Sequence, residues 1–258
     1  MVASARILRH TEIARGIFDL RFFSPDAART ATPGQFVHIR VSDSFDFVLR
    51  RPLSVCRVDP SEGSVTVVYR VQGAGTRRLA TMAAGAQLDV LGPLGQGFPL
   101  HAGDVRAVLV GGGVGVPPLV ELAARLAAQG TAVTSVVGFQ TRAQAILQDE
   151  LALYGDVRTT TDDGSLGLRG LVTGVLTQGF VDGANRYYAC GPTPMLQAVQ
   201  RTMAGLQVPG YLSLEERMGC GFGICVGCVH PIERDGRVQN LKTCKDGPVF
   251  PAGEVLFT

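Results

Sequence analysis

Four cysteines near the end of the chain have a spacing that suits redox chemistry. Cys220, Cys225, Cys228 and Cys244 are separated by four, two and fifteen residues. The first two gaps match the run that holds a plant-type [2Fe–2S] cluster, in which a distant fourth cysteine completes the site. Neighbouring glycines allow such a loop to turn its N–H groups toward the sulfur atoms. The spacing predicts a [2Fe–2S] cluster on these four cysteines.

Two other interpretations of the cysteines stay open at this point. A structural zinc ion also takes four cysteine ligands, although zinc ribbons usually present two C-x-x-C pairs. Only Cys225 and Cys228 form such a pair here. Buried thiols that bind nothing are the third interpretation, and the Gly-rich surroundings disfavour it. Cys56 and Cys190 lie far from this segment, so we do not expect them to be ligands.

A second group of residues, closer to the N-terminus, has the chemistry that binds FAD. A barrel that holds FAD needs an arginine for the pyrophosphate, a hydroxyl near the flavin and a glycine whose backbone approaches closely. All three occur in chain order, although each piece alone could be a turn. The residues predicted to bind FAD are Arg51, Pro52, Leu53, Ser54, Val68, Tyr69, Arg70, Gly75 and Thr76.

A glycine-rich turn further along the chain suits a nucleotide. Gly111, Gly112, Gly113 and Gly115 join a buried apolar run to a helical pattern. The standard G-x-G-x-x-G fingerprint is absent. A Gly-rich turn that leads into a helix N-terminus can still bind phosphate. A plain strand–helix turn is the alternative.

The surrounding periodicity indicates how these groups are positioned. Residues 1–98 consist of short alternating or β-branched runs with turns between them, which predicts an antiparallel β-barrel. The Gly- and Pro-rich stretch 92–104 marks a boundary. Apolar runs then alternate with helical patterns, which predicts a doubly wound parallel sheet. The expected domains are an FAD-binding barrel (1–98), an NAD-binding α/β domain (99–210) and a small [2Fe–2S] cysteine domain (211–258). Expected strands cover 18–23, 36–41, 64–71, 105–112, 132–139 and 185–190, and helices 117–130, a stretch ending at Leu151, and 194–206.

Composition limits the possible partners and compartment. The 258 residues are 46% hydrophobic and 18% charged, with a formal net charge of +2. This balance, without Lys or Arg runs, gives no case for nucleic acid. We expect no membrane span, because the uncharged stretches are short and interrupted, and no signal peptide. A cytoplasmic protein is therefore expected, in which thiols stay reduced.

The motifs together resemble a known family. Arg51-Pro52-Leu53-Ser54 and Gly75-Thr76 resemble the FAD motifs of the ferredoxin–NADP reductase superfamily. The segments that flank the cysteines resemble a narrower group of proteins. LEERM before them and KDGPVF after the last are similar to those of electron-transfer subunits of dihydroorotate dehydrogenase B. The similarity covers essentially the whole chain.

The resemblance implies an activity and a partner. Electrons from dihydroorotate, released at the FMN of a separate catalytic subunit, would pass through the cluster and FAD to NAD⁺ in pyrimidine (UMP) biosynthesis. The implied assembly is a heterotetramer of two catalytic and two electron-transfer subunits. The Gly-rich loop would bind NAD, with Cys190, Gly191 and Pro192 near the nicotinamide. No residue is assigned a catalytic role beyond this placement of Cys190. We expect NAD rather than NADP, because no clear basic pocket for a 2′-phosphate is present.

Rival functions remain. The nearest is a flavin and iron–sulfur subunit of an NAD(P)H–ferredoxin oxidoreductase or a hydrogenase complex. A non-enzymatic, zinc-stabilised binding module belongs to a different class. Among single residues, Glu215 or Glu216 could lie near the flavin, and a solvated charge pair with Arg217 competes with that interpretation. His38, on a barrel strand, is expected to do no more than line the FAD pocket.

Overall fold

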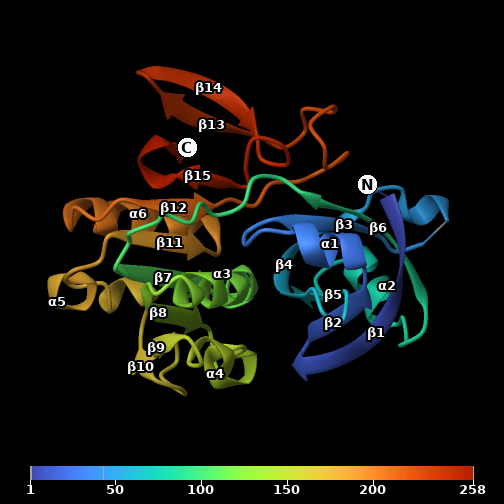
Figure 1. Cartoon of the computed structure of the whole chain (residues 1–258), viewed down its shortest axis with the longest axis horizontal. Helices are drawn as coiled ribbons and strands as arrows, with labels where there is room; N and C mark the ends of the chain where they lie inside the picture. Colours follow the sequence, from blue (N-terminus) through green and yellow to red (C-terminus); the bar gives the residue numbers. More distant parts are fainter. Residues whose placement is uncertain (1, 43, 258) are drawn as a thin grey trace.

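A computed structural model describes residues 2–42 and 44–257. Figure 1 shows a barrel at the N-terminal end of the chain, a sheet covered by helices beside it, and a C-terminal hairpin above the sheet. This arrangement confirms the predicted fold class of an antiparallel barrel followed by a doubly wound sheet and a small cysteine-bearing segment.

The barrel is closed and its neighbouring strands are antiparallel, in the order β1-β2-β5-β4-β3-β6. Val65, Val67 and Tyr69 point into the barrel core, while Val68 packs into the core of the α/β part. This explains why Val68 interrupts the polar face that Ser64, Thr66 and Arg70 otherwise form. The strands are β1 (Val2–Ala14), β2 (Ile17–Phe23), β3 (Phe36–Arg40), β4 (Arg51–Asp59), β5 (Ser64–Arg70) and β6 (Gln87–Leu94), with helices α1 (Pro25–Thr30) and α2 (Ala74–Ala80) and the 3₁₀ turn η1 (Phe45–Phe47).

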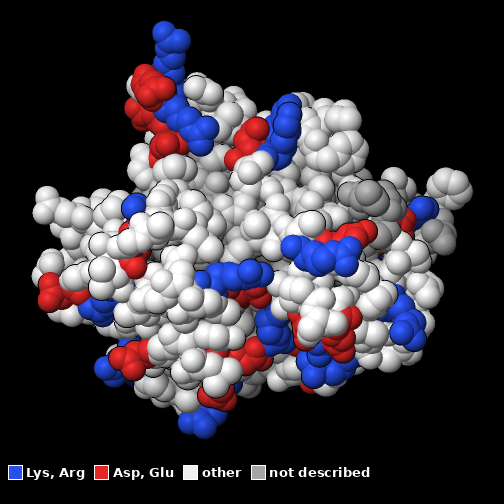
Figure 2. Space-filling model, in the orientation of Figure 1, with Lys and Arg blue, Asp and Glu red and all other residues white. Residues whose placement is uncertain are grey.

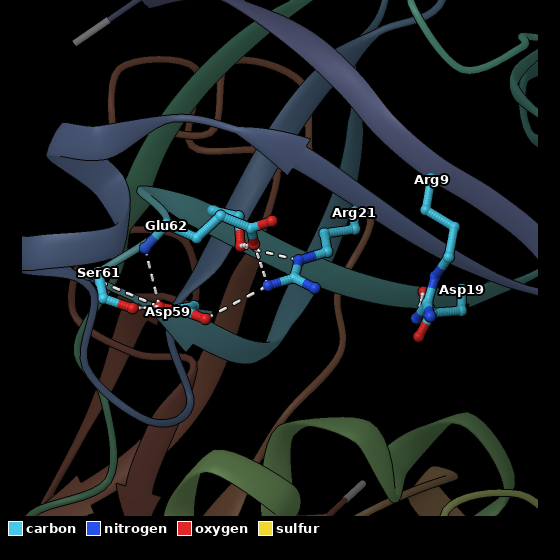
Figure 3. A network of polar contacts seen from close by, with 7 residues as sticks. Arg9, Asp19, Arg21, Asp59, Ser61 and Glu62 are labelled. Carbon is cyan, nitrogen blue, oxygen red and sulfur yellow. Dashed lines mark hydrogen bonds and ion pairs between the residues drawn. The ribbon is translucent and has the colours of Figure 1, made fainter.

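A polar network fixes the turn between β4 and β5 (Figure 3). Arg21 Nη2 lies 3.4 Å from Asp59 Oδ2 and also contacts Glu62. Asp59 Oδ1 accepts hydrogen bonds from the Ser61 hydroxyl and from the Glu62 N–H. The Ser61 hydroxyl and then the Glu62 N–H hold the pKa of the Asp59 carboxyl below its ordinary value. The turn thereby fixes the Asp59–Ser64 end of the β4–β5 pair, and a register shift between Val55 and Arg57 separates this end from the predicted FAD motif.

The second sheet has the order β10-β9-β8-β7-β11-β12-β15. Its strands are parallel except β15, which runs antiparallel to β12. Helices α3 and α4 pack on one face, and α5 and α6 on the other. The strands are β7 (Arg106–Gly112), β8 (Ala132–Phe139), β9 (Gly155–Thr161), β10 (Leu168–Arg169), β11 (Arg186–Cys190), β12 (Gly210–Ser213) and β15 (Val249–Pro251), with α3 (Pro117–Ala128), α4 (Gln148–Leu151), α5 (Gln178–Val181) and α6 (Thr193–Gly205).

The C-terminal segment returns to this sheet. Its hairpin, β13 (Val229–Arg234) and β14 (Arg237–Lys242), turns at Asp235 and Gly236, which both have positive φ, as a two-residue hairpin loop favours. Ile232 is buried in the core between the sheet and α6. Because β12 and β15 both belong to the sheet, the segment shares backbone hydrogen bonds with the preceding part. The domain boundaries stay predictions.

One feature of the α/β part differs from the sequence expectation. The helix expected to end at Leu151 is broken into the 3₁₀ turn η3 (Arg142–Gln144) and the short α4. Leu147, between them, has a φ of 63°, a conformation that ends a right-handed helix.

No helix among the described residues is long and apolar enough to cross a membrane.

Charged contacts join the barrel to the α/β part. Glu121 of α3 is buried, and its carboxylate accepts hydrogen bonds from the Val58 N–H at 3.1 Å and from Arg125 Nε at 2.8 Å. Arg57 of β4 contacts Glu150 of α4 and lies 2.5 Å from Asp19 Oδ2. These contacts hold the two parts in one orientation.

Candidate functional site

A cavity of about 270 Å³ opens where the barrel faces the sheet. All of the residues predicted to bind FAD line it except Gly75. They come from β4, β5 and the start of α2, which the barrel places side by side. The barrel therefore brings together the three parts of the predicted FAD motif, each of which alone could be a turn. The lining residues from the prediction are Arg51, Pro52, Leu53, Ser54, Val68, Tyr69, Arg70 and Thr76.

Gly75 lies behind this lining, where it makes room for an arginine. A Cβ at Gly75 would overlap the guanidinium of Arg51. Thr76 Oγ1 accepts hydrogen bonds from the N–H groups of Gln72 and Gly73, at 3.0 and 3.2 Å. These contacts fix the turn beside Arg51. An arginine held in this way can bind a pyrophosphate.

The opposite wall of the cavity comes from residues far away in sequence. Cys190, Ser213 and Glu215 lie on it. Burial, and then the nearby Glu215 charge, raise the pKa of Cys190 to about 12, so this thiol is uncharged at neutral pH. The Glu215 side chain faces the cavity, and its partly enclosed position raises its pKa. Of these three residues, the sequence predicted only Glu215, together with its neighbour Glu216, as a candidate to lie near the flavin. The remaining lining consists of Phe36, Gln72, Val114, Leu214, Glu216, Met218 and Pro248.

A second cavity, of about 310 Å³, lies at the carboxyl ends of the parallel strands. The strand order reverses between β7 and β11, and such a switch point is where open α/β sheets bind ligands. Gly112, Gly113 and Pro192 line the cavity. Much of its remaining wall comes from the ends of β8 and β9 and from the segments that follow these strands, which contribute Phe139, Gln140, Gln144, Thr160, Asp162, Gly170, Leu171 and Thr173. None of these residues is among those predicted to bind NAD; Asp162 belongs to the turn Asp162–Ser165, which by sequence is either a plain turn or a border of the nucleotide.

The other predicted NAD residues lie behind or beside this cavity. A Cβ at Gly115 would overlap the backbone of Cys190, and one at Gly191 would overlap Met195. Gly111 packs against Val116 and Leu119. These glycines therefore allow the Gly-rich loop and the segment at Cys190–Pro192 to pack closely. Cys190 itself lines the first cavity instead of the second.

The two cavities adjoin at Arg70. Its side chain lines both, and it approaches Gly113. Val114, the next residue, lines the first cavity. A nucleotide in the second cavity can therefore extend its reactive end toward a group in the first.

The four cysteines lie together as two pairs. The thiols of Cys220 and Cys225 contact each other, as do those of Cys228 and Cys244. In the described part of the chain, no group of three or more Cys, His, Asp or Glu is arranged to hold a metal ion. A [2Fe–2S] cluster has two irons that share four cysteines, so two pairs fit it better than they fit one zinc ion bound by all four.

Backbone N–H groups surround the cysteine sulfurs. The N–H groups of Ile224 and Cys225 donate to Cys220 Sγ at 3.3 and 3.4 Å. Partial burial acts to raise the pKa of Cys220, but the N–H groups of Cys225 and Phe222, the Cys225 thiol and the Ile224 N–H outweigh it and lower the pKa to about 6. Gly221 and Gly223 have φ values of 82° and 91°, and this conformation lets the loop turn inward. The donor set suits an anionic iron–sulfur group.

The barrel strand β3 forms the floor beneath this loop. Phe36 is buried together with Cys228 and Cys244, and it also lines the first cavity. His38 is fully buried and does not line the FAD cavity, so the expectation for His38 was wrong. Burial lowers the pKa of His38 to about 4. The first cavity and the cysteines are thus separated by the Phe36 side chain.

The outer surface of the cysteine loop is apolar. Phe222, Ile224 and Val226 are 50%, 75% and 55% exposed. The neighbouring barrel loop exposes Phe45, Val48 and Leu49 as well. Figure 2 shows Lys and Arg interspersed with Asp and Glu over the drawn face, without a large field of one sign.

Comparisons with known protein families agree with this geometry. Residues 215–256 match the iron–sulfur cluster binding domain of dihydroorotate dehydrogenase B. Residues 109–201 match the oxidoreductase NAD-binding domain. The first match spans the cysteines, and the second spans the Gly-rich loop and Cys190.

Similar whole proteins extend these matches. The dihydroorotate dehydrogenase B (NAD⁺) electron transfer subunit of Shouchella clausii is 46% identical over 97% of this chain and 96% of that protein. Its counterpart from Geobacillus thermodenitrificans is 48% identical over 95% of each. A solved NADH-dependent reduced ferredoxin–NADP oxidoreductase is 33% identical, with a TM-score of 0.87 over 98% of this chain and 90% of that chain.

Proposed function

Because this chain belongs to the family of dihydroorotate dehydrogenase B (NAD⁺) electron-transfer subunits, we propose that its cavities and cysteines form one path for electrons. The family makes it an FAD- and [2Fe–2S]-containing, NAD-linked oxidoreductase subunit of pyrimidine biosynthesis. The proposed path rests on one observation, which is that the two cavities and the cysteines form a continuous series. Arg70 lies in both cavities, and Phe36 lies between the first cavity and Cys228 and Cys244.

Each site has a proposed occupant. Arg51, Ser54 and the Gly75–Thr76 turn would hold FAD, and Gly112, Gly113 and Pro192 would contact NAD. Cys220, Cys225, Cys228 and Cys244 would hold the [2Fe–2S] cluster. When bound, FAD supplies the means to exchange single electrons on one side and a hydride on the other. The chain's residues orient the nicotinamide end toward the flavin cavity, and the uncharged Cys190 adds no competing charge there.

The exposed apolar side chains of the cysteine loop support a docking site for the catalytic subunit. Phe222, Ile224 and Val226 lie beside the cysteines, so a partner seated on them would approach the cluster closely. Burying such side chains favours association. We further propose that the partner holds FMN, that two copies of each subunit assemble, and that the complex works in the cytoplasm, where free clustered thiols persist.

Reconstitution with the partner tests this function. The purified chain should be brown-yellow, with flavin and iron–sulfur absorption, and should reduce a dye with NADH. It should oxidise dihydroorotate only when the catalytic subunit is present. Robust dihydroorotate turnover by the isolated chain, or a colourless protein containing zinc, would overturn the proposal. An F222S/I224S double variant should keep the dye activity and lose the coupled activity, whereas a V238S variant on the exposed hairpin should keep both.

A second candidate function is transfer of electrons from NAD(P)H to ferredoxin. The similarity to the NADH-dependent ferredoxin–NADP oxidoreductase favours it. The higher identity to the dihydroorotate dehydrogenase B subunits supports the first candidate. An assay that supplies ferredoxin and the catalytic subunit at equal concentration, and measures the rate of electron exchange with each, decides between the two candidate functions.

A further inference from the structure

A buried histidine lies directly beneath the cysteine loop. His38 of β3 has no exposed surface, and a Cβ at Gly221 would overlap His38 Nδ1. Position 221 follows the first cysteine, Cys220. The imidazole therefore touches the turn of the loop that carries this cysteine.

The histidine ring is held firmly from the barrel side. Phe36 packs edge-on against it, with ring centroids 6.3 Å apart. Arg50 Nη1 donates to the backbone carbonyls of His38 and Asp89, at 3.3 and 3.1 Å. The pairing of β3 with β6 shifts register between Phe36 and His38, and such a bulge re-aims side chains. The bulge and these contacts give the ring one direction, toward the loop.

The ring nitrogens have no other use among the described residues. Neither Nδ1 nor Nε2 meets a partner with good hydrogen-bond geometry there. The backbone of Cys220 nevertheless lies near enough to act on the imidazole, as does that of Arg50. A buried polar group without a partner is costly, so a contact with the loop provides a reason for a histidine at this position.

We propose that His38 is a positioning residue for the cluster, whose Nδ1 side holds the Cys220–Gly221 turn against the barrel. The turn leads into the N–H groups of Ile224 and Cys225 that face Cys220 Sγ. Such N–H groups stabilise the extra negative charge of a reduced iron–sulfur group and raise its reduction potential. His38 thus sets how well the loop accepts an electron. This inference rests on the proposed assignment of the cluster to the four cysteines.

Paired substitutions test the contact. His38→Asn keeps an N–H donor near the place of Nδ1, His38→Gln places one nearer to Nε2, and His38→Leu removes both. Val65→Ala is the control, because Val65 is equally buried in the barrel core but lies in another cluster of side chains. The readouts are the midpoint potential of the cluster and the electron paramagnetic resonance spectrum of its reduced form, together with the FAD potential.

We expect His38→Leu to lower the equilibrium constant for cluster reduction about tenfold, which is 59 mV for one electron. His38→Asn should restore most of this loss and His38→Gln should not, while the FAD potential and the V65A cluster stay unchanged. An unchanged potential in His38→Leu, or equal values in the Asn and Gln variants, would overturn the role. If His38→Leu loads no cluster, the Asn and Gln pair decides. Absence of a cluster from the unmodified chain would instead refute the proposed function.

Discussion

The barrel and the cysteine loop treat the same chemical group in opposite ways. Cys56, in β4, is fully buried, and burial raises its pKa to about 12. In the loop, backbone N–H groups together with the Cys225 thiol outweigh partial burial and bring the pKa of Cys220 to about 6. Strands use up their N–H groups on one another, whereas an irregular glycine-rich turn can direct them at sulfur. The strand thus keeps the Cys56 thiol protonated, and the turn around Cys220 prepares that one thiol for an anionic role, whereas burial raises the pKa of Cys244 to about 12 as well.

The strongest way to break this contrast is to remove one thiol of the loop. Cys225→Ser should abolish the [2Fe–2S] cluster, because each of the four sulfurs is needed to hold the two irons. The barrel should keep FAD and the NADH-dependent dye activity, since its cavity does not involve Cys225. Iron and sulfide content, FAD content and both activities measure this. The matched Cys56→Ser variant should retain the cluster, and loss of FAD from Cys225→Ser would contradict the separation of the two regions.

Alkylation of the cluster-free chain sharpens the comparison. At pH 7 and with iodoacetamide, Cys220 should react about 10³-fold faster than Cys56, because the thiolate is the reactive form and Cys56 is also inaccessible. Peptide mass spectrometry over a time course measures both rates. Restoring the cluster should protect Cys220 together with Cys225, Cys228 and Cys244, and leave the rate of Cys56 unchanged. Similar rates for the two residues would show that the N–H groups of the loop do not stabilise the Cys220 thiolate.

A glycine substitution tests the shape of the loop itself. Gly221→Ala imposes a Cβ at a φ of 82° and an overlap with His38, so it should destabilise the loaded chain by about 3 kcal/mol. Gly236→Ala is the control, because its φ of 69° is similar and nothing lies near the added Cβ. It should cost only about 1 kcal/mol. Denaturant unfolding of both variants measures the difference, and equal costs would rule out the overlap.

The smallest expected effect concerns pH and the barrel thiol. The pKa of Cys56 is raised from 9.0 to about 12 in the folded chain. The unfolded chain therefore loses this proton first, and stability that is fully present below pH 9.0 falls as the pH rises toward 12. Cys56→Ala should reduce that slope by up to about 1.4 kcal/mol per pH unit. Urea unfolding at pH 8 to 11 measures the slope. An unchanged slope would mean that Cys56 ionises in the folded chain.

Much of the fold was predictable because its signals are local. The strand at 132–139 and the helix that begins at Pro117 follow directly from apolar periodicity and from proline placement. The helix expected to end at Leu151 failed for a reason that periodicity does not encode, namely the left-handed backbone at Leu147. The hairpin of β13 and β14 was missed because Pro231 lies inside β13 and argues against a strand, and because most of β14 is exposed.

The candidate site divides in the same way. The cysteines and the Arg51–Ser54 motif are recognisable from type and spacing. Phe36 and Ser213 carry no local signal, because they reach the cavity only through the pairing of distant strands. His38 was placed on the correct strand, but the cysteine loop, nearly two hundred residues later in the chain, decides what its ring faces. Contacts between residues so far apart in the sequence can be identified only from the folded structure.

The pairing of β12 with β15 brings the two ends of the cysteine segment together in the sheet. Ser213 and Val249 are direct partners across these strands, and Leu214 N–H bonds to the Pro248 carbonyl at 2.9 Å. The chain therefore leaves the sheet and re-enters it at nearly the same point, so everything between is an insertion with adjacent ends. A short turn could join these ends without stretching the sheet, but the cavity wall formed by Glu215, Glu216 and Met218 would be lost, as would the core packing of Ile232. The same two junctions would accept a segment with a different cluster or a different partner surface.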